Sequence, residues 1–318
     1  MLTYCLFVIG FFILIKGAGL LVDGASAIAD KFKISPLVIG LTIVAFGTSA
    51  PELAVNIFAS AAGSSEIAIG NIIGSNIANI LLILGVSALI YPLTSKKNTV
   101  WKEIPLGLLA AVVVGLMAND FLIDGAIFSG LSRIDGLVLL SFFIIFIYYS
   151  FGIAKQQESS DDCEIKNLNL VKSIFYIVIG LIGLVVGGNW IVSGAIKLAV
   201  GFGISESLIG LTVVAIGTSL PELATSAIAA YKKQADIAIG NVVGSNIFNI
   251  FCILGISSVI RPLPFNPANN IDFLIMIIAT VILFIIMFIG KKRIIERWQG
   301  IAMISIYVAY TLFLIVTR

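Results

Sequence analysis

Two stretches of this chain repeat each other at a constant offset of 170 residues, without a gap. The first, GLTIVAFGTSAPELA, begins at Gly40, and the second, GLTVVAIGTSLPELA, begins at Gly210. A second matched pair follows them, IAIGNIIGSNIANI and IAIGNVVGSNIFNI. Each copy places a glutamate, Glu52 or Glu222, in the middle of an apolar segment. An ionisable group at membrane depth is costly and usually marks the path of an ion or a substrate.

The composition supports a membrane location for these segments. The 318 residues are 59% hydrophobic and 11% charged, whereas soluble domains carry about 25% charged residues. The length allows roughly ten spans of about 20 residues. Histidine is absent and the three cysteines are scattered, which argues against a metal cluster or a disulfide framework. The sequence predicts ten spans, over 3–29, 35–62, 66–92, 100–119, 134–152, 171–199, 205–231, 236–260, 271–290 and 298–317.

The polar stretch 153–170 is the predicted linker between two repeats, 1–152 and 171–318. Each repeat holds five predicted spans. Because five is odd, the two repeats enter the membrane from opposite sides, as in many secondary transporters. The predicted fold is therefore an all-α polytopic membrane protein, with ten transmembrane helices arranged as two inverted five-helix repeats.

The basic residues indicate the orientation. With the N-terminus outside, 14 of the 19 Lys and Arg residues fall on inner loops, which is a strong positive-inside bias. We therefore expect a multi-pass protein of the plasma membrane. Both termini are expected to be extracellular, and the central linker cytoplasmic.

A proline interrupts each repeated helix. Pro51 and Pro221 cannot donate to the carbonyl four residues earlier, and their rings crowd it. These carbonyls belong to Gly47 and Gly217, where no side chain resists distortion. We expect both helices to break here and to free carbonyl oxygens at 45–47 and 215–217, including those of Ala45 and Ala215. Broken backbone at membrane depth is tolerated where it lines a cavity or is buried in protein.

Polar side chains with oxygen atoms cluster around each break. Three or four residues separate each glutamate from a hydroxyl, so they can share a helix face. The companion segments carry a polar stripe at i, i+4 and i+8. An all-oxygen set suits Ca²⁺ and Na⁺, whereas Mg²⁺ is rarely held in an all-protein cage. The hydroxyl and amide residues concerned are Thr48, Ser49, Asn71, Ser75 and Asn79, with Thr218, Ser219, Asn241, Ser245 and Asn249 in the second repeat.

The motifs G-T-S-x-P-E and G-N-x-x-G-S-N-x-x-N, present twice, resemble the α-repeats of the Na⁺/Ca²⁺ exchangers. The resemblance implies that Glu52 and Glu222 are central ligands shared by Ca²⁺ and Na⁺. Hydroxyl and carbonyl oxygens of Thr48, Ser49, Thr218 and Ser219 would complete that centre. Flanking Na⁺ sites would involve Ser75 and Ser245 with the carbonyls of Ala45 and Ala215, and Asn79 and Asn249 match the polar positions at the cage centre.

The resemblance also implies that the spans over 3–29 and 171–199 slide across the rest as a gating pair. Their glycines (Gly17, Gly19, Gly24, Gly183, Gly187, Gly188 and Gly194) would form a smooth sliding face. Asn249 departs from relatives that carry aspartate at its position, which bears on K⁺ co-transport and on the stoichiometry.

The expected function is secondary antiport of Ca²⁺ against Na⁺ by alternating access, with net charge movement. Two fixed charges are balanced by one Ca²⁺ or by two Na⁺, and an empty site is costly, which favours exchange over a channel. An H⁺/Ca²⁺ antiporter and a cation channel remain alternatives. An enzyme fits poorly, because the sequence shows no nucleophile–base pair or metal–His set. The ions are expected to be substrates rather than cofactors, and no protein partner is implied.

Overall fold

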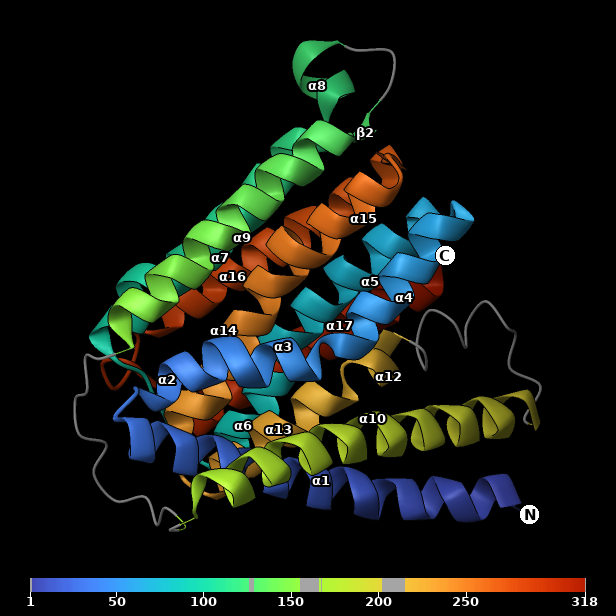
Figure 1. Ribbon diagram of the computed structural model, residues 1–318. Helices are drawn as coiled ribbons and strands as arrows, with labels where there is room; N and C mark the ends of the chain where they lie inside the picture. Colours follow the sequence, from blue (N-terminus) through green and yellow to red (C-terminus); the bar gives the residue numbers. More distant parts are fainter. Residues whose placement is uncertain (1, 126–128, 155–165, 167, 202–214, 318) are drawn as a thin grey trace.

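Two long helices, α1 (Leu2–Phe32) and α10 (Leu170–Gly201), run side by side and antiparallel along one edge of the molecule (Figure 1). The structure is a computed structural model that describes residues 2–125, 129–154, 166, 168–201 and 215–317. Twelve of the 18 residues of the predicted linker, 155–165 and 167, lie outside these residues.

Glycines at seven-residue spacing join α1 to α10. A Cβ added at Gly17 would lie 2.9 Å from the carbonyl oxygen of Gly180, and one at Gly10 would lie 2.9 Å from that of Gly187. The two backbones therefore touch, as small residues allow in membrane helices. The expectation of a glycine-rich sliding face is wrong for Gly17, Gly24, Gly183, Gly187 and Gly194, because these glycines face the partner helix of the pair.

The first repeat continues with the broken span. Its two parts, Pro36–Thr48 and Ala50–Ala62, meet at an angle of 47°. The first part comprises α2 (Pro36–Ile39), a π-helical turn η1 (Gly40–Val44) and α3 (Ala45–Thr48), and the second is α4 (Ala50–Ala62). The remaining elements are α5 (Ser65–Ala78), η2 (Asn79–Ile83), α6 (Leu84–Ile90), η3 (Thr99–Glu103), α7 (Ile104–Met117), α8 (Asp120–Asp124) and α9 (Arg133–Ile153).

The described part of the second repeat follows the same order. After α10 come α12 (Ala215–Thr218), α13 (Leu220–Tyr231), α14 (Ala235–Phe248), η5 (Asn249–Leu254), α15 (Gly255–Ile260), η6 (Pro267–Asn269), α16 (Asn270–Ile286) and α17 (Arg297–Thr317). Two short antiparallel pairs, which the sequence analysis does not predict, tie loops together. They are β1 (Leu93–Thr94) with β4 (Ile294–Ile295), and β2 (Gly130–Leu131) with β3 (Leu263–Pro264).

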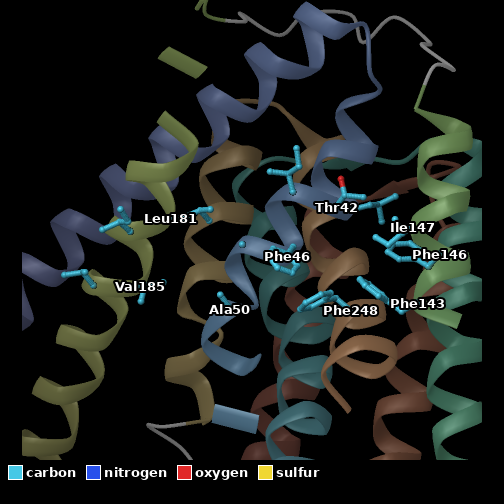
Figure 2. A pocket seen from close by; sticks show the side chains of 14 residues that line it. Thr42, Phe46, Ala50, Phe143, Phe146, Ile147, Leu181, Val185 and Phe248 are labelled. Atoms are coloured by element: carbon cyan, nitrogen blue, oxygen red, sulfur yellow. The ribbon is translucent and has the colours of Figure 1, made fainter. Parts of the chain in front are cut away.

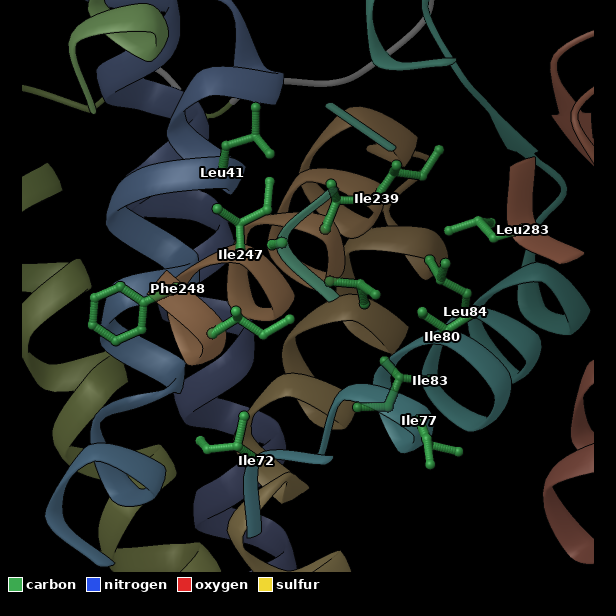
Figure 3. Packing of buried hydrophobic residues seen from close by; sticks show 14 of the residues in the cluster. Leu41, Ile72, Ile77, Ile80, Ile83, Leu84, Ile239, Ile247, Phe248 and Leu283 are labelled. Atoms are coloured by element: carbon green, nitrogen blue, oxygen red, sulfur yellow. The ribbon is translucent and has the colours of Figure 1, made fainter. Parts of the chain in front are cut away.

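The all-helical membrane fold is confirmed. Among the described residues, eight straight helices and the one bent pair are long and apolar enough to cross a membrane. The seventh predicted span, 205–231, begins in residues that the structure does not describe and continues as α12 and α13. The segments of α5–η2 and α14–η5 occupy the centre, and their isoleucines form much of the core around the polar site (Figure 3).

Candidate cation site

Both predicted helix breaks are present, and each lies at a serine. Ser49 has φ −82° and ψ 8°, and Ser219 has φ −87° and ψ 5°. The following proline occupies the first turn of α4 or α13, where its missing N–H costs nothing. Glu52 and Glu222 lie in the same first turns, where the positive end of the helix dipole favours a carboxylate.

Each serine at a break reaches the glutamate of the opposite repeat. Ser49 Oγ donates to Glu222 Oε1 at 2.8 Å, and Ser219 Oγ lies 3.3 Å from Glu52 Oε1. The companion serines close each group, since Ser245 Oγ lies 3.0 Å from Ser49 Oγ and Ser75 Oγ lies 3.2 Å from Ser219 Oγ. The two halves therefore build one site between them.

The threonines make a parallel set of crossed contacts. Thr48 Oγ1 donates to Asn241 Oδ1 at 3.0 Å, and Thr218 Oγ1 donates to Asn71 Oδ1 at 3.4 Å. The sequence analysis places both asparagines on the polar stripes. In the structure their side chains hold the threonines of the opposite repeat.

Two further asparagines, Asn76 and Asn246, position the amides at the centre. Asn79 Nδ2 donates to Asn246 Oδ1, and Asn249 Nδ2 donates to Asn76 Oδ1, both at 2.9 Å. Asn76 and Asn246 are not among the predicted site residues, although they occupy the same position in the two copies of G-N-x-x-G-S-N-x-x-N. That repetition is the signal that could have identified them.

Four of the buried oxygen atoms without a hydrogen-bond partner in the described residues belong to this site. Each of the four belongs to a residue that is only 1% exposed. Among the described residues, no lysine or arginine forms an ion pair with either glutamate. Buried acceptors are normally satisfied, and a buried charge needs a counter-charge. A cation supplies both. The four atoms are Glu52 Oε2, Glu222 Oε2, Asn79 Oδ1 and Asn249 Oδ1.

The carbonyl of Ala45 differs from expectation. It accepts a hydrogen bond from Ser49 N at 3.0 Å, and Thr48 Oγ1 lies 3.3 Å from it. The prediction of a free oxygen is therefore wrong at this position, because α3 stays helical up to the break. Ala45 as a cation ligand stays a prediction that requires these bonds to be exchanged. Ala215 opens α12 next to residues that the structure does not describe, and its role also stays a prediction.

π-helical turns begin at the two central asparagines. Asn79 opens η2 and Asn249 opens η5, and π-turns inside α-helices often occur at functional sites. These turns have no recognisable sequence signal in the repeats.

The apolar cavity in Figure 2 is separate from this oxygen site. It measures about 640 Å³, and its walls include Phe46, Phe143, Leu181, Val185 and Phe248. Thr42 also lines it, but its hydroxyl donates to the carbonyl of Val38 at 2.6 Å. The cavity therefore presents hydrocarbon and offers no oxygen cage for an ion.

Known proteins resemble this chain over nearly its whole length. The sodium/calcium exchanger protein family matches residues 2–152 and 172–316. A "Putative antiporter CaxA" of Alkalimonas amylolytica is 38% identical, over 98% of each chain. The "Sodium/calcium exchanger MaX1" of Methanosarcina acetivorans is 33% identical, also over 98% of each chain.

A solved structure agrees with the sequence comparisons. The sodium-calcium exchanger NCX_Mj, soaked with Na⁺ and Ca²⁺, is 36% identical with a TM-score of 0.83, over 97% of each chain. The repeats, the crossed oxygen site and these matches lead to the same conclusion: the chain belongs to the sodium/calcium exchanger protein family.

Proposed function

We propose that this protein exchanges Ca²⁺ for Na⁺ by alternating access, with Glu52 and Glu222 as the shared charged ligands. The observation that carries the proposal is the group of four unpartnered oxygens between the repeats. Two are carboxylate and two are amide oxygens, a ligand set that hard cations prefer.

Family membership supplies the broader function. The chain is a cation/Ca²⁺ exchanger rather than an enzyme, and Na⁺ and Ca²⁺ are transported substrates rather than cofactors. The charge of the site favours coupled transport. One Ca²⁺ or two Na⁺ balance the two carboxylates, whereas an empty site leaves two buried charges uncompensated. Loaded forms therefore cross between the two access states more readily than the empty form.

The hydroxyl groups serve both the central cation and the Na⁺ ions that flank it. Ser75 and Ser245 lie beside the glutamates and would hold flanking Na⁺ together with the carbonyls of Ala45 and Ala215. Thr48, Ser49, Thr218 and Ser219 would complete the centre. The pair α1–α10 would move as one body across the other helices of the two repeats, 1–152 and 171–318.

The bias of basic residues supports an orientation in the plasma membrane with both termini outside and residues 153–170 in the cytoplasm. Single cysteines at Lys97 and Asp124, in a background without the native cysteines, test it. An impermeant thiol reagent added to intact cells should label position 124 and not position 97. Labelling at position 97 and not at position 124 would show the opposite orientation.

The decisive experiment measures ⁴⁵Ca²⁺ uptake into vesicles that contain the purified protein. Uptake should require internal Na⁺ and be absent in K⁺-loaded vesicles. Uptake driven by an acid interior without Na⁺ would establish the H⁺/Ca²⁺ alternative instead. Ca²⁺ flux without any counter-ion would establish a channel.

A further inference from the structure

Another buried carboxylate lies on α1, away from the cation site. Asp23 is 8% exposed and lies nine residues before the end of α1. Its two oxygens bind two lysines: Lys232 Nζ at 2.6 Å and Lys166 Nζ at 2.8 Å. Lys232 follows α13, and Lys166 belongs to the linker between the repeats. Asp23 therefore ties α1 to two segments that lie outside the membrane spans.

Neighbouring contacts reinforce this attachment. Lys232 Nζ also donates to the carbonyl of Gly19 at 2.8 Å, and Ser26 Oγ bonds Gln234 Oε1 at 2.6 Å. Lys232 and Gln234 both lie in the short connection between α13 and α14. Because the glycine contacts join α1 to α10, holding α1 at this end also holds its partner.

The residues of this attachment have no charged counterparts in the other repeat. The 170-residue offset relates Asp23 to Ser193 and Lys232 to Ala62, neither of which carries charge. Ser26 corresponds in the same way to Ile196. Two inverted halves with identical contacts would give the two access states equal energy. A charged contact present in one half alone breaks that equality.

We propose that Asp23 is a positioning residue that holds α1 against the connection between α13 and α14, and so favours the state closed at the linker end. This inference rests on the proposed alternating access. Opening at that end would separate a largely buried carboxylate from Lys232, which is itself only 27% exposed. Lys166 contributes less, because it is 61% exposed and screened by solvent.

The test compares Asp23→Asn and Lys232→Gln with the control Asp30→Asn. Asp30 is also an α1 carboxylate paired with a lysine, Lys33 at 3.1 Å, but that pair is exposed and lies within three residues. The reporter is Thr225→Cys in a background without native cysteines. Thr225 is buried one turn beyond Glu222, toward the linker end.

Loss of the contact should speed labelling of this cysteine by an impermeant reagent from the linker side, by roughly threefold to tenfold. Asp30→Asn should leave the rate unchanged. The ratio of the Ca²⁺ KM values at the two faces should shift by a similar factor, which a uniform loss of folded protein would not produce.

Unchanged labelling and an unchanged KM ratio in both test variants would overturn the proposal. If Asp23→Asn does not fold, the result for Lys232→Gln decides the test, because Lys232 lies in a loop, where substitution disturbs folding less. Suppose that the test variants are labelled faster but the unmodified protein shows no Na⁺-dependent Ca²⁺ uptake. That result would support the role of Asp23 and contradict the proposed exchange of Ca²⁺ for Na⁺. The two failures are thus distinguishable.

Discussion

Ser49 donates a hydrogen bond to Glu222 across the boundary between the two repeats, at 2.8 Å. The matching atoms of Ser219 and Glu52 are 3.3 Å apart. Each glutamate is thus oriented by a hydroxyl of the opposite repeat, 173 residues away for Glu222 and 167 residues away for Glu52. Neither repeat holds a complete site, so the cation site exists only when both are docked.

Replacing either glutamate by glutamine should abolish exchange. Glu52→Gln or Glu222→Gln removes one of two buried charges and turns N–H donors toward the cation. We expect Ca²⁺ uptake to fall by roughly 100-fold or more in either variant. Glu66→Gln is the control, since this exposed residue accepts a hydrogen bond from Asn266 and lies outside the cation site. Near-normal uptake by Glu222→Gln would show that Glu222 does not contact the ion.

Removing the crossed hydroxyl should weaken binding without abolishing it. Ser49→Ala deletes the donor to Glu222, and a hydrogen bond to a charged group is worth about 1.5–3 kcal/mol. The Ca²⁺ KM should rise by roughly tenfold or more. Ser141→Ala is the control, because that hydroxyl donates to its own helix at Leu137 O. An unchanged KM in Ser49→Ala would remove this hydroxyl from the proposed site.

Exchange should move net charge across the membrane. Glu52 and Glu222 carry −2 together, and the neutral amides Asn79 and Asn249 add nothing. Ca²⁺ cancels this charge, and a third Na⁺ on the flanking oxygens would leave one positive charge. A potential set by valinomycin and K⁺ supplies about 2.3 kcal/mol per charge per 100 mV.

Such a potential should therefore change the rate of Na⁺-dependent Ca²⁺ uptake. Indifference to the potential would contradict the expected stoichiometry. K⁺ itself should be dispensable, because Asn249 lacks the charge that an added K⁺ would need. A requirement for K⁺ as a substrate would contradict this interpretation of Asn249.

Two glycines of α10 should respond in opposite directions to alanine. A Cβ at Gly180 would lie 2.7 Å from Leu21 N and 2.8 Å from Gly17 O, so Gly180→Ala must push α1 away. At Gly188 no atom lies within 4 Å of the added carbon. Alanine there should gain up to about 1 kcal/mol of helix propensity.

Thermal unfolding of the purified protein in detergent measures both variants. Gly180→Ala should lower the Tm, whereas Gly188→Ala should raise it or leave it unchanged. Equal Tm values for the two variants would show that the close contact between α1 and α10 contributes little to stability.

The sequence by itself determined the helical membrane class, the breaks before Pro51 and Pro221, and the oxygen-bearing residues around Glu52 and Glu222. Hydrophobic runs, prolines and exact internal repetition are local signals, and they specify local structure. The repeat offset also paired the residues that share a role in the two halves. It could not indicate which atoms of the two halves touch.

Only the tertiary structure decided those contacts. Docking of the two repeats directs Ser49 to Glu222. Asn246 and Asn76 accept hydrogen bonds from the amide nitrogens of Asn79 and Asn249, whose amide oxygens stay unpartnered. The same docking turns Gly10, Gly17 and Gly24 of α1 toward α10, and it brings Lys232 to Asp23. These contacts join residues far apart in the chain, and their geometry depends on how whole helices pack, which no local pattern encodes.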